Sequence, residues 1–213
     1  MRLVLLIGLL ACGTCSKAAG PRKLEPDLIK VSPDARMRTD IVGGDEFTDT
    51  STFVLVDAEN TSGEGAYVTL GGELTDAGGA KVSDLTLVSL WIPSHDARTF
   101  ALVDTERKPR PTATAARIHM RGAQVPTAPP MARVEDIHAF DDHGRIVING
   151  TLVNDADRDG MAMVVASFHD ADHRPIKRPF RMVEIAAKHS TTVQFIGPPG
   201  SKQGDIFVAD LVY

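Results

Sequence analysis

Apolar and polar residues alternate with a period of two in many short segments of the chain. The alternation over residues 66–76 and 160–170 places every second side chain on one face of an extended strand. Turn-forming Gly, Pro, Asp and Asn interrupt the pattern about every 8 to 12 residues, and no segment has a convincing helical period. The pattern predicts an all-β protein made of antiparallel β-sandwiches.

The alternating segments repeat after 94 residues. Residues 53–60 align with residues 147–154, and both segments end in Asn before a polar turn. After a slip of one residue, the alignment extends to residues 98–102 and 191–195. Such self-similarity indicates two copies of one structural unit.

The repeat and the composition divide the chain. We predict one sandwich over residues 41–125 and a second over 134–213, with the Pro-rich segment 126–133 as a stiff linker. Residues 12–40 are rich in Pro, Lys, Arg and Asp without sustained periodicity, which predicts a flexible tether. Residues 1–11 precede the tether.

The repeated pattern resembles a known kind of domain. Each copy has a strand ending in Asn and a short loop, then a strand that in the second copy ends in Phe168-His169-Asp170, a turn, and a strand rich in Thr and Phe. This order resembles the small immunoglobulin-like domains of bacterial envelope proteins, of which the FxLYD type is one. His169 departs from the family, which usually has Tyr there, and so does Leu74-Thr75 in the first copy. The resemblance implies a display or docking module and transfers no catalytic residue.

The first residues resemble the export signal of a bacterial lipoprotein. Arg2 precedes the apolar run Leu3 to Leu10, which is too short to span a bilayer, and Leu9-Leu10-Ala11 places a small residue before Cys12. The resemblance implies cleavage after residue 11 and several acyl chains on Cys12, which anchor durably. It also implies the outer membrane, facing the periplasm, because Gly13 does not signal retention in the inner membrane.

The same cysteine allows other interpretations. Cys12-Gly13-Thr14-Cys15 has the CxxC spacing of thiol oxidoreductases, but that chemistry needs a helix N-terminus within a βαβ unit, and Ser16 to Pro21 has the composition of a linker. The lipid anchor is therefore favoured. An ordinary cleaved signal that ends near Ala18-Ala19-Gly20 stays open.

The charge of the chain limits its partners. The formal net charge is −5, and Arg2 is the only charged side chain in the first 11 residues, so the mature chain would carry −6. A negative protein is poorly suited to bind nucleic acid or an anionic membrane surface.

Two acidic segments are candidates for metal chemistry. Asp155, Asp157 and Asp159 stand at alternate positions before Gly160, as in the first half of a calcium loop, but the twelfth position is Ala166 instead of Glu. A solvated turn is therefore favoured over a calcium site, because turns also select Asp and Gly.

The second candidate is the segment His169-Asp170-Ala171-Asp172-His173. Zinc needs three or four ligands from a rigid frame, and this segment is a strand followed by a turn. We expect His169 to face solvent and Asp170 to shape the turn. The other histidines are scattered: His95, His119, His138, His143 and His189.

These observations lead to one expected function and two alternatives. We expect a lipid-anchored envelope protein without enzymatic activity or a cofactor, which binds or positions an envelope protein or glycan through interstrand loops or a sheet edge. The alternative is a calcium- or carbohydrate-binding module with its site at Asp155 to Gly160. An enzyme would need a pocket between the sandwiches.

Overall fold

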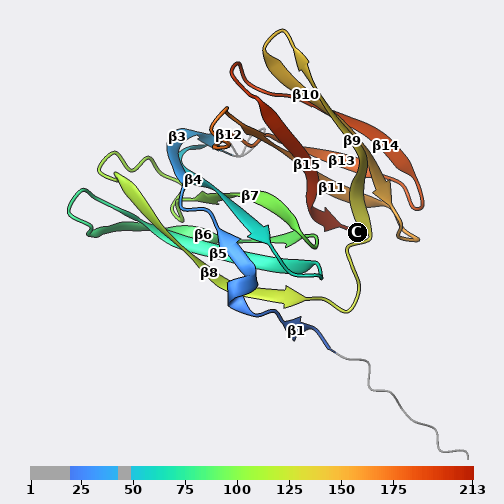
Figure 1. Ribbon diagram of the computed structural model, residues 1–213, viewed down its shortest axis with the longest axis horizontal. Coiled ribbons are helices and arrows are strands. Elements are labelled where there is room, and N and C mark those ends of the chain that lie inside the picture. The colour runs from blue at the N-terminus through green and yellow to red at the C-terminus, as the bar shows by residue number, and fades with distance from the viewer. Residues whose placement is uncertain (1–19, 43–48) are drawn as a thin grey trace, which may run out of the picture.

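A computed structural model describes residues 20–42 and 49–213 of the chain (Figure 1). The described residues form strands β1 to β15 and one turn of 3-10 helix, η1 (Pro26–Leu28). All strand pairings are antiparallel, which confirms the predicted all-β sandwich architecture. Within these residues, no helix has the length and apolar character needed to cross a membrane.

The first sandwich consists of two sheets. Sheet A has the strand order β1 (Arg22–Lys23), β8 (Ala115–Val125), β5 (Ala66–Thr75), β6 (Lys81–Ile92). Sheet B places β4 (Asp49–Asn60) between β7 (Asp96–Val103) on one side and both β2 (Ile29–Val31) and β3 (Arg36–Val42) on the other.

The second sandwich repeats this arrangement. Sheet C has the order β14 (Ser190–Ile196), β10 (Arg145–Asn154), β9 (Ala132–Asp142). Sheet D places β11 (Gly160–His169) between β15 (Gln203–Val212) and the short strands β12 (Pro175–Lys177) and β13 (Phe180–Ile185). Sheet C therefore corresponds to sheet B, and sheet D to sheet A.

Two asparagines show the repeat at the level of single hydrogen bonds. Asn60 and Asn154 are both fully buried at the end of their strands. The Nδ2 of Asn60 donates to the carbonyls of Glu64 and Ile92, and the Nδ2 of Asn154 donates to those of Arg158 and Ala186, four and 32 residues ahead in both cases. Each asparagine closes the loop after its strand by satisfying buried carbonyl groups.

The turns after β5 and β11 also match. The Oδ1 of Asp76 accepts the N–H of Gly78 and Ala80, and the Oδ1 of Asp170 accepts the equivalent pair. The residue three positions after the Asp has a positive φ in both copies, 80° at Gly79 and 59° at His173. The prediction that Asp170 shapes this turn is confirmed.

The predicted tether is wrong over residues 22–40. Residues 22–40 contribute β1, β2 and most of β3, and the side chains of Leu24 and Ile29 are buried in the core of the first sandwich. Strands β2 and β3 together form the edge of sheet B next to β4, as β9 forms the edge of sheet C next to β10. The registers correspond, because Ile29 pairs with Asn60 and Ala132 pairs with Asn154. The sequence of residues 22–40 shows no alternation of apolar and polar residues, because the edge of the sheet is split into β2 and β3 and most of their side chains are exposed.

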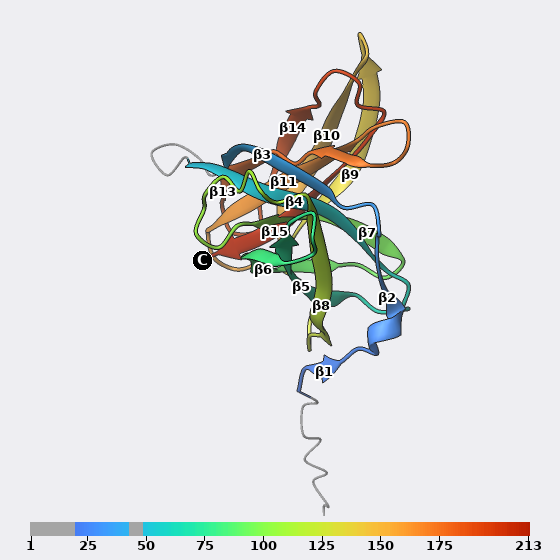
Figure 2. The same ribbon diagram turned by 90° about the vertical axis from the view of Figure 1, so that its left-hand side faces the viewer.

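Most of β11, the central strand of sheet D, is buried on both faces. Ala162, Val164 and Phe168 point into the core between sheets C and D. On the opposite face of the sheet, Val165 and Phe207 are buried and belong to the core of the first sandwich. Figures 1 and 2 accordingly show the two sandwiches packed against each other, with β11 and β15 beside the first one.

Candidate functional site

A groove runs between the two sandwiches, and we call it the interdomain groove. It has a larger compartment of about 410 Å³ and an adjoining one of about 200 Å³, and both contact Trp91, Pro130, Ala132 and Val208. The larger volume lies within the range of roughly 300–1,000 Å³ typical of ligand pockets. Its further lining residues are Pro93, Asp96, Arg98, Pro129, Arg133, Val134, Ile137, Asp205, Ile206 and Phe207. Those of the smaller compartment are Tyr67, Met131, Ala209, Asp210, Leu211 and Tyr213.

Arg98 links the two sandwiches inside the larger compartment. Its Nη1 lies 2.7 Å from Asp96 Oδ2 on its own strand β7 and 3.0 Å from Asp205 Oδ2 on β15. Its guanidinium carbon lies 5.0 Å from the centroid of the Phe207 ring. The side chain is only 9% exposed, and its Nε is buried without a hydrogen-bond partner among the described residues. A buried donor of this kind is costly, which is a frequent property of functional sites.

Burial changes the acidity of two groups that line the groove. Desolvation raises the pKa of Asp205, although the nearby Arg98 acts in the opposite direction. Desolvation and the Asp210 carboxylate raise the pKa of Tyr67, so that its hydroxyl keeps its proton.

Two aromatic rings form one wall of the groove. Tyr67 on β5 pairs directly with Trp91 on β6, and the ring centroids are 5.4 Å apart with planes inclined at 60°. The indole lies on the backbone of Gly65, where an added Cβ would come within 2.2 Å of the ring. Glycine at this position therefore allows the indole to settle against the sheet. Pro129 and Pro130, which belong to the predicted linker, also line the groove.

His169 lies at the interface of the two sandwiches, not in solvent. Its Nε2 is 3.1 Å from Asp57 Oδ2, and its side chain is 16% exposed. The predicted exposure is wrong because β11 is covered by sheet B. Thr99 donates its hydroxyl to Asp57 at 2.5 Å and lies 3.4 Å from the same Nε2 of His169. Since one imidazole nitrogen meets both groups, this cluster lacks the relay geometry of a hydrolytic triad.

Cations from both sandwiches fix the interface. Arg178 Nε donates to the Thr99 carbonyl at 2.7 Å, and desolvation lowers the pKa of Arg178 to about 10. Arg36 Nη2 lies 2.5 Å from Asp170 Oδ2. Arg38 donates to the carbonyl of Ile176. These contacts hold the walls of the groove in a fixed relation.

The predicted metal ligands do not converge. Asp155 pairs with Arg133, Asp157 Oδ1 lies 3.0 Å from Lys188 Nζ, and Asp159 Oδ1 accepts the N–H of Ala187. In the second acidic segment, His173 Nδ1 contacts Gln203 Oε1, whereas His169 Nε2 contacts Asp57 Oδ2. Within residues 20–42 and 49–213, no group of three or more His, Cys, Asp or Glu is arranged to hold a metal ion. The geometry gives the calcium hypothesis no support.

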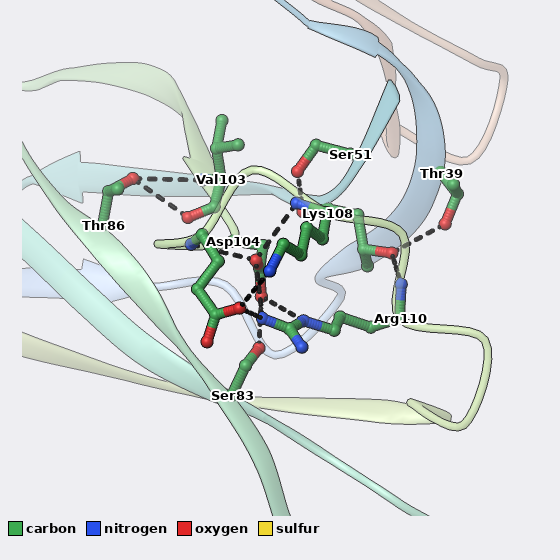
Figure 3. A network of polar contacts seen from close by, with 10 residues as sticks. Thr39, Ser51, Ser83, Thr86, Val103, Asp104, Lys108 and Arg110 are labelled. Carbon is green, nitrogen blue, oxygen red and sulfur yellow. Dashed lines mark hydrogen bonds and ion pairs between the residues drawn. The ribbon is translucent and has the colours of Figure 1, made fainter. Parts of the chain in front are cut away.

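A dense polar cluster lies elsewhere, around the fully buried Asp104 after β7 (Figure 3). Its carboxylate accepts Ser83 Oγ at 2.5 Å, Arg110 Nε at 2.8 Å and Arg110 Nη2 at 3.1 Å, besides the N–H groups of Glu106 and Lys108. Burial alone would raise the pKa of Asp104, but these hydrogen bonds hold it below its usual value. The donors saturate the carboxylate, so the cluster fastens the β7–β8 loop to the sandwich.

Cys12 and Cys15 lie outside the described residues, as do the predicted signal peptide and the first part of the tether. The structure therefore does not bear on the lipid anchor.

Sequence reasoning missed the interdomain groove, although a signal was present. The outward positions of β5 are Tyr67, Thr69 and Glu73, whereas those of β11 include Met163 and Val165. A strand that is apolar on both faces needs a partner on each. This difference between the copies marks the docking face.

Comparisons with known proteins identify no family. No family model matches the sequence, and no curated protein matches it. Among solved structures, the crystal structure of red sea bream transglutaminase is similar over 81% of this chain and 29% of that one, with 12% identity and a TM-score of 0.26. The chain thus spans less than a third of that structure.

This comparison corrects one expectation. The prediction that the chain is not an enzyme is contradicted, because the structure it matches is that of an enzyme. A similarity this weak carries no assignment of an activity, so the all-β description rests on the sheets themselves.

Proposed function

We propose that the protein is a lipid-anchored envelope protein, attached through Cys12, that binds another envelope component in the interdomain groove. The observation that carries the proposal is the groove itself. Buried contacts fix both walls, and one wall presents a tryptophan and a tyrosine beside charged groups. Pre-formed concave sites with a few oriented polar groups are the usual form of binding sites.

The strand order supports an immunoglobulin-like type for both domains. In the first sandwich β4 pairs with β7 and β5 pairs with β8, and in the second β10 pairs with β14 and β11 with β15. This corresponds to the B–E and C–F neighbours of immunoglobulin sandwiches. The lipobox-like segment Leu9 to Cys12 supports the anchor.

The anchor is tested with Cys12→Ser. In a bacterial host, this variant is expected to lose incorporation of labelled palmitate and to move from the membrane to the soluble fraction, because no acyl chain can attach. Cys15→Ser is the matched control and is expected to stay in the membrane. Equal membrane association of Cys12→Ser and the wild type would contradict the anchor.

Binding is tested by capture from solubilised envelopes on the immobilised full chain. Trp91→Ala is expected to lose the captured component, because the indole forms a wall of both compartments. Leu87→Ala on the same strand is the control, since Leu87 is 63% exposed and does not line the groove. Identical recovery by both variants would exclude the groove as the binding site.

A further inference from the structure

The interdomain groove has chemistry that selects among ligand classes, and this inference rests on the proposed function. Its two guanidinium groups already have carboxylate partners. Arg98 is paired with Asp96 and Asp205, and Arg133 with Glu135 and Asp155. The lining thus offers no spare guanidinium to a phosphate or carboxylate, so an anionic ligand would meet the carboxylates without compensation.

The apolar part of the groove is aromatic. Tyr67 and Trp91 form a tilted pair along one side, and Tyr213 lines the smaller compartment, where its ring packs 4.1 Å from the guanidinium carbon of Arg158. Aromatic rings combine a large apolar face with a polar edge, and Tyr67 retains a hydroxyl donor. Such faces suit the C–H surfaces of sugar rings, which are apolar on the face and polar around the rim.

The larger compartment, which Trp91 also lines, contains two carboxylates. The side chains of Asp96 and Asp205 are 43% and 36% exposed, so each retains accessible carboxylate surface although Arg98 holds both. Carboxylate oxygens in a partly desolvated site accept strong hydrogen bonds from hydroxyl groups. Arg98 offsets one of the two negative charges, and the accessible carboxylate oxygens can accept hydrogen bonds from the hydroxyl groups of a neutral ligand.

We propose that the interdomain groove binds a neutral saccharide, with sugar rings against Trp91 and Tyr67 and hydroxyl groups donating to Asp96 and Asp205. The site differs from the Asp155 to Gly160 loop, whose carboxylates are engaged by Arg133, Lys188 and a backbone N–H. An extended glycan can occupy both compartments, since they share Trp91 and Pro130.

Trp91 is the single tryptophan of the chain and therefore reports directly on the groove. Full-length protein carrying Cys12→Ser is titrated with neutral β-linked hexasaccharides of glucose and of N-acetylglucosamine while tryptophan emission is recorded. We expect a saturable change with at least one of them. Tyr67→Ala is expected to weaken binding about tenfold, because it removes one stacking face.

Phe140→Ala is the matched control, because Phe140 is an aromatic residue that is 48% exposed on β9 and does not line the groove. It is expected to leave the titration unchanged, and thermal unfolding verifies that both variants are folded. A flat titration with both sugars, or equal affinity of Tyr67→Ala and the wild type, overturns the saccharide proposal. If capture from envelopes still depends on Trp91, the groove then serves another partner and the proposed function stands.

Discussion

Two carboxylates, the fully buried Asp104 and the partly exposed Asp205, show how the surroundings of a single residue decide its contribution to stability. Asp104 is ringed by donors, so its charged form is favoured and its pKa is lowered. Asp205 is desolvated and shares Arg98 with Asp96, so its pKa is raised. The first carboxylate stabilises the fold when ionised, whereas ionisation of the second opposes burial.

Asp104→Asn is therefore expected to lower the free energy of unfolding at pH 7 by roughly 3 kcal/mol, because Arg110 loses a buried partner. Asp205→Asn is expected to cost less than about 1 kcal/mol, since Arg98 keeps Asp96. Urea unfolding measures both.

The pH dependence follows from the lowered pKa of Asp104. Its contribution is complete above the pKa of about 3.9 in the unfolded chain and is lost as the pH falls from there through the folded-state pKa. The gap between the wild type and Asp104→Asn should hold from pH 8 to about pH 5 and narrow below about pH 4. A gap that stays constant down to pH 3 would contradict this role.

At the scale of elements, strands that lie at an edge were the hardest to predict. The long central strands β5 and β11 each place every second side chain in the core of their own sandwich, and the opposite face of β11 is also apolar because it packs on the first sandwich. Strands β2 and β3 pair with β4 but bury little more than Ile29, so their sequence resembles a linker. They are strands because they form hydrogen bonds with β4, and such pairing produces no periodic pattern in the sequence.

The position of the domain boundary can be tested by truncation. A chain that begins at residue 20 is expected to unfold cooperatively like the full chain. A chain that begins at residue 41 loses β1, β2 and most of β3, exposes the core facing Leu24 and Ile29, and is expected to leave the first sandwich unfolded. Circular dichroism and thermal unfolding compare the two truncated chains. Equal melting temperatures would mean that residues 22–40 are a tether and not part of the first sandwich.

At the scale of the whole molecule, the two similar units behave as one body because sheet D differs from its counterpart sheet A. The second sandwich contributes Val165 and Phe207 to the core of the first, and Arg36, Thr99 and Arg178 add polar contacts across the interface. The groove exists because this docking brings β6, the 126–131 segment and β15 together.

Val165→Lys is expected to disrupt this docking, because it places a charge at a fully buried interface position. Limited proteolysis should then cleave within residues 126–131 much faster than in the wild type. Leu87→Lys, at an exposed position on β6, is expected to retain the wild-type cleavage rate. Equal cleavage of Val165→Lys and the wild type would mean that the interface is not needed to hold the sandwiches together.

The sequence alone determined the all-β class, the 94-residue repeat and the turn at Asp170, because alternation and turn chemistry are local properties that neighbouring residues encode. The sequence also shows that both faces of β11 are apolar, but it does not show which part of the molecule covers the second face. Only the tertiary structure decided that residues 22–40 belong to the fold, that His169 meets Asp57, and that Trp91, Arg98 and Asp205 line one groove. These features depend on contacts between segments that are distant in the chain, and such contacts produce no periodic pattern in the local sequence.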